Sequence, residues 1–285
     1  MIEQSKIDAA IKKLQAFEPP DGYYVAFSGG KDSQCVYHLC EMAGVKFDAH
    51  YRVTSVDPPE LVRFIREQYP DVEREIPHDA DGKPITMWNL IVKVGRPPSR
   101  KSRYCCSDLK ESGGKGRVTV TGVRWDESPR RAKSRGPVEI LTRPADAKRM
   151  ALRRGVEVAV NPKGGVILND DNDRARRYVE VCYRTMKTLV NPIVDWSTED
   201  VWSFLNDVAK VPHCCLYDQG YDRLGCIGCP MASVKSRRRD FERYPKYKEA
   251  YLRAFRRMLD KRDEEGRPSE IYSTPEEVMD FFMSS

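Results

Sequence analysis

The clearest chemical signal is the segment Ser28-Gly29-Gly30-Lys31-Asp32-Ser33. Its two glycines let the backbone curl so that successive N–H groups point inward and hold an anion. Lys31 adds a point charge for phosphate, and the two serine hydroxyls can donate hydrogen bonds. It is not a Walker A loop, because Val25 stands where that motif has its first glycine and Asp32 where it has Ser or Thr. The alternative is a glycine turn that holds no ligand.

Cysteines form the second group, with nine in 285 residues. They include two adjacent pairs, Cys105-Cys106 and Cys214-Cys215, and one Cys-x-x-Cys, Cys226 to Cys229. This arrangement favours metal or redox chemistry over a disulfide framework. Cys35 and Cys40 fall on an expected helix and are interpreted as core residues.

The elements that must position these residues alternate along the chain. A strand at residues 23–27 leads into the glycine loop, and a helix then runs to Ala43 and ends at Gly44. A strand at 47–56, a helix at 58–69 and a strand at 118–121 follow, and an amphipathic helix precedes them with Ile7, Ile11, Leu14 and Phe17 on one face. Strands alternating with helices predict an α/β fold with a mostly parallel sheet and helices on both faces.

The stretch 136–181 is interpreted as an insertion. Residues 156–160 and 166–168 flank Asn161-Pro162-Lys163-Gly164-Gly165 and predict a hairpin, followed by an exposed polar loop at 169–173. The tail from Tyr244 to Arg262 is predicted to be helical, with Tyr247, Tyr251, Phe255 and Leu259 at a spacing of four.

A strand, the sequence SGGKDS and a helix together resemble the PP-loop pyrophosphatases, which bind adenine nucleotides and cleave between the α- and β-phosphates. Further segments resemble the phosphoadenosine-phosphosulfate reductase branch in order. They are Thr121-Gly122-Val123-Arg124-Trp125-Asp126-Glu127-Ser128-Pro129-Arg130-Arg131, Asn191-Pro192-Ile193-Val194-Asp195-Trp196-Ser197-Thr198-Glu199-Asp200-Val201-Trp202, and Leu216-Tyr217 through Gly225–Cys229. The likeness covers roughly residues 20–235.

The resemblance implies a Rossmann-like PP-loop domain at residues 1–235 and a helical C-terminal extension at 236–285. It implies a site for ATP or a related adenine nucleotide with Mg²⁺, in which Lys31, Asp32 and Arg124 are catalytic. The expected nucleotide-binding residues are Ser28, Gly29, Gly30, Lys31, Asp32, Ser33, Gly122, Arg124, Ser128 and Arg131. Arginines suit bidentate phosphate contacts, while the alternative for Arg124 and Arg131 is a surface ion-pair face. Trp196 and Trp202 are expected to pack in the core.

Cluster-bearing members of this branch imply the ligands Cys105, Cys106, Cys226 and Cys229 for a [4Fe–4S] cluster beside the nucleotide loop. Four thiolates suit that cluster, and they also suit structural zinc; free thiols are the third alternative. One of the adjacent pair need not be a ligand, which would leave an iron open. Cys214 and Cys215 are the next candidates for a cluster ligand or a nucleophilic thiol. The alternative is that they are small apolar residues of the core.

The leading functional hypothesis is an enzyme that adenylates a substrate, releases pyrophosphate and uses the cluster for sulfur transfer or redox chemistry. Reductases of this branch use a later cysteine in the tail, and none follows Cys229 here. Reduction of adenylyl sulfate, with Cys214 or Cys215 as the thiol, is therefore the alternative. A non-catalytic binding module with a structural metal is the third.

Composition bounds the partners. Hydrophobic residues at 40%, charged residues at 32% and no long apolar run are typical of a cytoplasmic protein without a membrane span. Basic residues gather at 96–103, 130–135, 148–154, 174–177 and 235–239, within a net charge of +6. They are either solvated faces or a surface for nucleotide phosphates or a nucleic acid. A sulfur or electron donor protein is the other expected partner.

Overall fold

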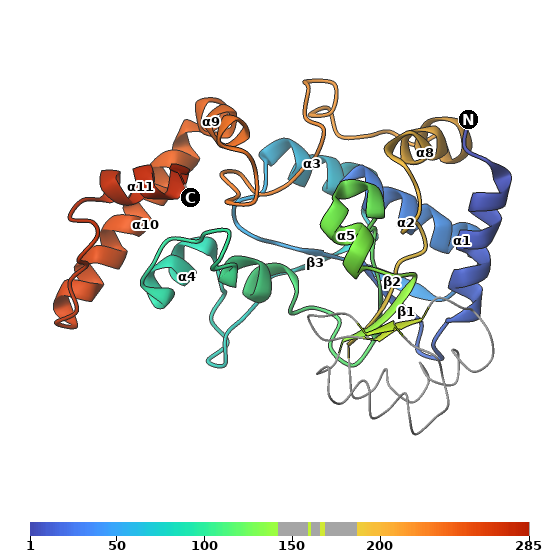
Figure 1. Cartoon of the computed structure of the whole chain (residues 1–285), viewed down its shortest axis with the longest axis horizontal. Helices are drawn as coiled ribbons and strands as arrows, with labels where there is room; N and C mark the ends of the chain where they lie inside the picture. The colour runs from blue at the N-terminus through green and yellow to red at the C-terminus, as the bar shows by residue number, and fades with distance from the viewer. Residues whose placement is uncertain (142–158, 161–165, 169–186, 285) are drawn as a thin grey trace. The chain divides into compact units, whose positions relative to one another are not determined.

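The computed structural model describes residues 1–141, 159–160, 166–168 and 187–284, and Figure 1 shows how the chain runs through them. The chain divides into two compact units. The first comprises Met1–Tyr51, Arg63–Glu73 and Gly113–Tyr221, and the second comprises Arg52–Val62, Arg74–Ser112 and Asp222–Ser285. A domain boundary after residue 235 stays a prediction.

Eight strands of the described chain form one sheet in the order β3-β2-β1-β4-β8-β5-β7-β6. Their bounds are β1 Tyr23–Ala26, β2 Phe47–Arg52, β3 Glu73–Glu75, β4 Val118–Val120, β5 Val138–Leu141, β6 Ala159–Val160, β7 Val166–Leu168 and β8 Lys187–Val190. β2, β1, β4 and β8 pair in parallel, whereas β5, β7 and β6 add an antiparallel edge. The predicted α/β class with a parallel core is confirmed.

The inserted hairpin is present as β6 and β7, with Ala159 opposite Ile167. Residues 156–158, the turn at 161–165 and the polar loop predicted at 169–173 lie outside the described residues. β5 is not expected from the sequence, because the charged Glu139 interrupts its apolar run. Glu139 is buried there, and it accepts hydrogen bonds from Asn191 Nδ2 at 2.7 Å and Arg135 Nη1 at 3.0 Å. These bonds allow a carboxylate to lie inside a strand.

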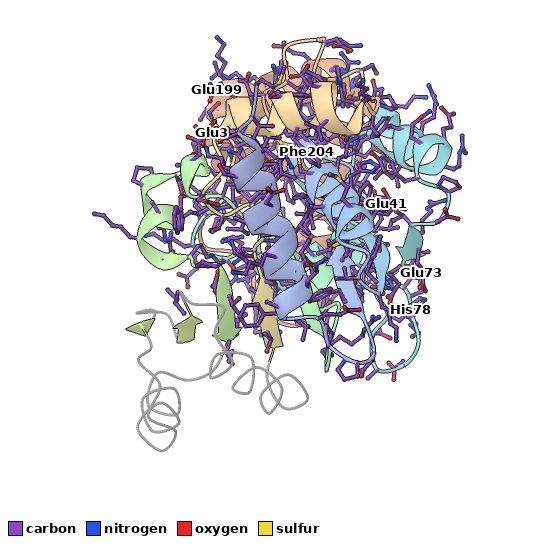
Figure 2. The ribbon with its side chains drawn as sticks, turned by 90° about the vertical axis from the view of Figure 1, so that its right-hand side faces the viewer. Glu3, Glu41, Glu73, His78, Glu199 and Phe204 are labelled. Atoms are coloured by element: carbon purple, nitrogen blue, oxygen red, sulfur yellow. The ribbon has the colours of Figure 1, made fainter. Side chains whose placement is uncertain are left out.

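Helices flank the sheet and build the second unit. Their bounds are α1 Gln4–Ala16, α2 Lys31–Ala43, α3 Pro59–Gln68, α4 Met87–Val94, α5 Pro129–Ser134, α8 Thr198–Ser203, α9 Val234–Arg243, α10 Pro245–Glu264 and α11 Pro275–Ser284, with short helical turns η1 Cys106–Lys110, η2 Trp125–Glu127 and η3 Phe204–Ala209. α1 and α2 lie side by side over the sheet (Figure 2). α2 ends at Gly44 in the left-handed conformation, φ 65°, as predicted.

The second strand is shorter than predicted, since β2 ends at Arg52 rather than continuing to residue 56. Ser55 adopts a left-handed φ of 65°, which a strand does not accommodate. The Asp57 carboxylate accepts a hydrogen bond from the Thr54 backbone N–H at 3.1 Å, so residues 54–57 form a turn. This turn belongs to the second unit and supports its cysteines.

The C-terminal residues are helical, as predicted, and they provide most of the core of the second unit. α10 buries Tyr251, Phe255 and Leu259, and Phe282 of α11 packs against the first two rings. Leu90 of α4 belongs to the same core. Among the described helices, none combines the length and the low polarity that crossing a bilayer requires.

Candidate active site

The glycine loop joins the end of β1 to the start of α2 in the first unit. The Phe27 N–H donates to the His50 carbonyl at 2.9 Å, and this bond continues the sheet ladder into the loop. Gly29 then takes a left-handed φ of 69°, which is costly for any residue with a Cβ. Gly30 caps α2, which begins at Lys31. The backbone therefore turns sharply and brings the positive end of α2 to the loop.

The two serines of the loop bind each other and the backbone. Ser33 Oγ accepts hydrogen bonds from the Ser28 N–H and from Ser28 Oγ, both at 3.2 Å, and it donates to the Gly30 carbonyl at 2.8 Å. These bonds fix the shape of the loop. The serines thus provide its internal structure, and their direct contact with a phosphate stays a prediction.

The loop lies at the point where the strand order changes direction. β1 pairs with β2 on one side and with β4 on the other, and the loop follows β1 while Gly122 follows β4. In open α/β sheets, ligands bind at the carboxyl ends of strands at such a switch point. Gly122 is in close contact with the first turn of α2, because a Cβ there would lie 2.8 Å from the carbonyl carbon and oxygen of Asp32.

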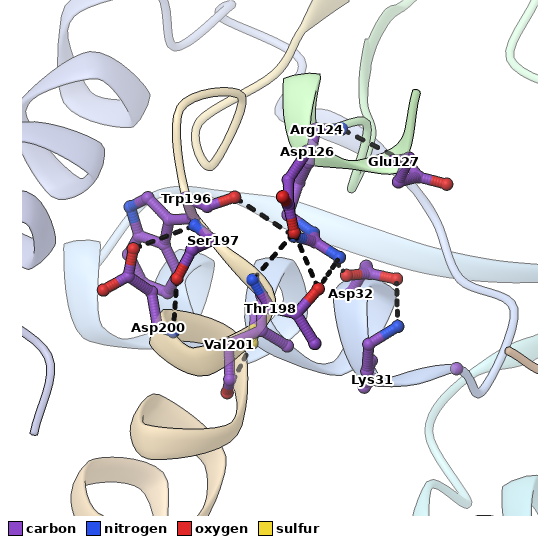
Figure 3. Close-up of polar contacts among 12 residues, drawn as sticks. Lys31, Asp32, Arg124, Asp126, Glu127, Trp196, Ser197, Thr198, Asp200 and Val201 are labelled. Carbon is purple, nitrogen blue, oxygen red and sulfur yellow. Dashed lines mark hydrogen bonds and ion pairs between the residues drawn. The ribbon is translucent and has the colours of Figure 1, made fainter. Parts of the chain in front are cut away.

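Arg124 is the centre of a buried polar network around this loop (Figure 3). Only 2% of its surface is exposed. Its Nε donates to Asp32 Oδ1 at 2.7 Å, and Asp32 Oδ2 lies 3.3 Å from Lys31 Nζ. The carboxylate of Asp32 therefore bridges the two cations and fixes both with respect to the loop.

The remaining donors of Arg124 reach the segment that leads into α8. Its Nη1 donates to Asp126 Oδ2 and to the Trp196 carbonyl, both at 3.1 Å, and its Nη2 donates to Thr198 Oγ1 at 3.3 Å. Hydrogen bonds from Thr198 and then from Arg124 hold the pKa of Asp126 below its ordinary value. Four of the five guanidinium N–H groups are thus engaged by protein atoms.

Ser128 precedes α5, Arg131 lies on α5, and both side chains contact this helix or the turn before it. Ser128 caps α5, and its Oγ accepts from the Arg131 N–H at 3.3 Å. The Arg131 guanidinium pairs with Glu127. The structure therefore brings together Lys31, Asp32, Gly122 and Arg124 at the loop. Ser128 instead bonds to the Arg131 backbone, and the Arg131 side chain bonds to Glu127. A nucleotide-binding role for these two residues stays a prediction.

Tyr217 is a site residue that the sequence analysis does not select. Its hydroxyl accepts from the Lys31 N–H at 2.9 Å, and this N–H belongs to the first turn of α2, where no carbonyl of the same helix can accept it. Its ring lies 5.9 Å from Lys31 Nζ and packs edge-on against Trp202. The available signal was its place in the segment that resembles the reductase branch. Trp196 is buried as predicted, whereas Trp202 is half-buried.

The predicted metal ligands all lie in the second unit. Cys105 is buried, whereas Cys106, Cys226 and Cys229 are half-buried. The hydrogen bond from Cys105 to Cys106, together with burial, raises the pKa of Cys105. That bond, with another from Arg103, lowers the pKa of Cys106 to about 5. The charges of Cys226 and Cys229 further raise the pKa of Cys105.

The Cys226–Cys229 loop is held by the turn at residues 54–57. Cys226 Sγ donates to Thr54 Oγ1 at 3.7 Å, and the Ile227 N–H donates to the Val56 carbonyl at 2.8 Å. Burial raises the pKa of Cys226 to about 11. The negative charge of Cys226 in turn raises the pKa of Lys110. A cation thus faces the thiols, as a cluster with net negative charge requires.

This donor set has the sulfur chemistry of a cluster or zinc site. Within the residues that the structure describes, no group of three or more His, Cys, Asp or Glu side chains has the spacing of a bound metal ion. The cluster therefore stays a prediction, as does its proximity to the glycine loop. Cys35, Cys40 and Cys214 are buried and Cys215 is exposed, while Cys182 lies outside the described residues.

A strand, a glycine loop and a helix N-terminus at the switch point of a parallel sheet define this chain as an α/β protein of the PP-loop class. The sequence profile of the phosphoadenosine phosphosulfate reductase domain matches residues 22–232. The chain belongs to the phosphoadenosine phosphosulfate reductase family.

Two proteins show the similarity in sequence. An uncharacterized protein of Methanocaldococcus jannaschii is 39% identical over 229 residues, which cover 77% of this chain and 44% of that protein. The adenosine 5'-phosphosulfate reductase of Allochromatium vinosum is 34% identical over 180 residues, which cover 61% of this chain and 53% of that enzyme. The matched regions thus span about half the length of each relative.

Among solved structures, a phosphoadenylyl-sulfate reductase from Candida auris in complex with phosphate aligns with a TM-score of 0.43 and 14% identity, covering 79% of this chain and 96% of that one. An FMN adenylyltransferase from Candida glabrata in complex with FMN and an ATP analogue aligns with a TM-score of 0.44 and 15% identity, covering 79% of this chain and 63% of that one.

Proposed function

We propose that the chain binds an adenine nucleotide at the loop of residues 28–33 and uses it to adenylate an acceptor. The observation that carries this proposal is the position of the loop at the switch point, where the α2 N-terminus, Lys31 and Asp32 meet the segment after β4. Backbone N–H groups and a lysine at a helix N-terminus provide the charge that a polyphosphate needs.

In the proposed step, a nucleophilic atom of the acceptor attacks the α-phosphorus of ATP. A new bond to the α-phosphorus forms, the bond from that phosphorus to the oxygen bridging the β-phosphate breaks, and pyrophosphate leaves with the electron pair. The acceptor loses its proton to solvent. Negative charge accumulates on the leaving pyrophosphate, and the loop N–H groups with Lys31 stabilise it there. Mg²⁺ bound to the phosphates would supply further positive charge.

Arg124 and Asp32 are assigned to positioning in this proposal. Arg124 has four of its N–H groups on protein atoms, so it has little capacity left for a phosphate. Its bond to Asp32 orients the carboxylate that contacts Lys31 Nζ. Arg124 thus acts on the nucleotide through Asp32 and Lys31.

Cys105, Cys106, Cys226 and Cys229 are proposed to hold a [4Fe–4S] cluster that supplies sulfur-transfer or electron-transfer chemistry when bound. The effect of Cys226 and Cys229 on the pKa of Cys105, and the cation of Lys110 beside Cys226, support this assignment. Anaerobic purification followed by iron and sulfide counts tests it, with the exposed Cys215→Ser as the matched control. Cys226→Ser should lose the iron and the absorbance near roughly 400 nm that thiolate-bound clusters show, and Cys215→Ser should keep both. Zinc in place of iron would refute the cluster.

Pyrophosphate release from ATP tests the adenylation step. The wild-type protein should release pyrophosphate with a suitable acceptor, and Lys31→Ala should release at least ~100-fold less, as expected when a group that stabilises transition-state charge is lost. Exposed Lys46→Ala is the control for a loss of one positive charge. Failure of ATP to bind or turn over, with the protein folded and its metal loaded, would refute the proposal.

Reduction of adenylyl sulfate is a second candidate, because the Allochromatium vinosum relative carries that reductase name. The same loop would then hold the nucleotide phosphate. A thiolate would attack the sulfur, the bond from that sulfur to the phosphate oxygen would break, and AMP would leave with the electron pair. A dithiol would then reduce the resulting thiosulfonate, releasing sulfite and becoming a disulfide. Exposed Cys215 is a candidate thiol, whereas its neighbour Cys214 is buried. Sulfite production from adenylyl sulfate with a dithiol reductant, abolished in Cys215→Ser, would place this candidate above adenylation.

A further inference from the structure

Two basic segments that are distant in the sequence lie together in the second unit. Residues 96–103 contain four cations and no carboxylate, and residues 235–239 contain four more. Arg100 joins them, because its Nε donates to the Pro230 carbonyl at 3.2 Å and its Nη2 donates to the Ala232 carbonyl at 3.3 Å. The exposed cations of the two segments are called the basic surface below. They are Arg96, Arg100, Lys101, Arg103, Lys235, Arg238 and Arg239.

Four of the seven cations of the basic surface have no carboxylate partner among the residues that the structure describes. They are Arg96, Lys101, Lys235 and Arg238, and Arg103 approaches Glu111 only at 3.7 Å. Like charges held side by side repel each other and raise the local positive potential, so a polyanion that neutralises them is attracted to the surface. The surface therefore has the electrostatics of a binding site for a polyanion.

We propose that the basic surface binds the phosphodiester backbone of a double-stranded nucleic acid. Five of its seven cations are arginines, whose planar guanidinium groups match phosphate oxygens in pairs. Exposed large apolar side chains beside it are limited, in the described residues 230–239, to Met231 at 46% and Val234 at 38%. That is too small an apolar face for insertion into a membrane. Few aromatic rings accompany the cations, which disfavours stacking on a single strand.

The basic surface borders the cysteine centre, since Pro230 follows Cys229 directly and its carbonyl is bound by Arg100. A bound duplex would therefore lie next to the thiols, and a nucleic acid becomes the acceptor class for the proposed sulfur chemistry. This last step rests on the proposed function. The binding itself requires neither ATP nor turnover, so the two can fail separately.

The test is fluorescence anisotropy with a labelled DNA duplex, the matching single strand and an RNA hairpin, without nucleotide, at several salt concentrations. The test variant is Arg96→Ala/Lys101→Ala/Lys235→Ala/Arg238→Ala. A matched control removes four exposed cations of the first unit, Lys46→Ala/Arg63→Ala/Arg66→Ala/Lys115→Ala. Thermal unfolding of both variants establishes that they are folded.

We expect the test variant to bind duplex at least ~100-fold more weakly at low salt, and to lower the slope of log affinity against log salt by about three to four, one per lost phosphate contact. The control should bind like the wild type. Binding of either the DNA duplex or the RNA hairpin that is lost in the test variant supports the proposal. The probe that binds more tightly shows whether the natural ligand is DNA or RNA. The proposal is overturned if the protein does not bind duplex, if both variants lose affinity equally, or if the single strand binds more tightly than the duplex. Tighter binding to anionic vesicles or polyglutamate than to duplex also overturns it.

Discussion

Replacing Gly122 with alanine tests whether the close contact between the segment after β4 and α2 builds the nucleotide site. An alanine Cβ would lie 2.8 Å from the Asp32 carbonyl carbon and oxygen, 0.6 Å inside the 3.4 Å at which contact becomes ordinary. Both atoms are backbone atoms of a helix turn, so they cannot rotate away. Overpacking of this kind costs about 1–3 kcal/mol. The first turn of α2, with Lys31 and Asp32, must shift to relieve it.

We therefore expect Gly122→Ala to lower the free energy of unfolding by about 1–3 kcal/mol and to weaken ATP binding, measured by urea unfolding and by calorimetric titration. Gly225→Ala is the control, because a Cβ at Gly225 would meet no atom within 4 Å. If Gly122→Ala binds ATP as tightly as the wild type does, whether or not the variant is less stable, nucleotide binding does not depend on this contact. Equal losses in the two variants would refute the steric argument.

Three further predictions concern buried polar groups and the cysteine loop. Arg124→Lys should lower the free energy of unfolding by about 1–3 kcal/mol in urea titrations, since an ammonium keeps the charge but cannot replace the four hydrogen bonds of the buried guanidinium. Burial raises the pKa of Asp200, but hydrogen bonds from Lys6 and the Ser197 N–H outweigh it and hold that pKa below 3.8. Asp200→Asn should therefore destabilise the fold by about 1–2 kcal/mol at neutral pH, and the difference should vanish as the pH falls through the lowered pKa. Gly228→Ala should lower the melting temperature and the iron content relative to Gly225→Ala, because Gly228 has φ 69° and its Cβ would lie 2.5 Å from the Phe241 ring.

The parallel core could be predicted from the sequence because its signals are local. Short apolar strands, the glycine loop and the Gly44 helix end each specify a conformation within a few residues, and the structure has all of them. β5 could not be predicted, because Glu139 is acceptable in a strand only when Asn191 and Arg135, one distant in sequence, reach it. The early end of β2 depends likewise on a turn in which Asp57 binds backward to Thr54.

In the candidate site, too, local features could be predicted and contacts between distant segments could not. Residue types and spacing select Lys31, Asp32 and Arg124, but they do not say that Arg124 is buried and bound to Asp126 and α8. That outcome depends on how two loops meet after folding. Tyr217 could not be predicted for the same reason: its hydroxyl reaches the Lys31 N–H from 186 residues away in the sequence.

The engagement of Arg124 constrains how the loop can manage phosphate charge. Arg124 binds both Asp32 and Asp126, and Asp32 also contacts Lys31, so the two carboxylates offset the charge of the two cations inside the protein. In the proposed binding, the groups that would face a nucleotide are the Lys31 ammonium and the N–H groups at the start of α2. One of those N–H groups is occupied by the Tyr217 hydroxyl, which a phosphate oxygen could replace as acceptor. If the proposed phosphate binds at this loop, it would exchange a neutral acceptor for a charged one beside an ammonium group, and the gain in charge-assisted hydrogen bonding would favour binding.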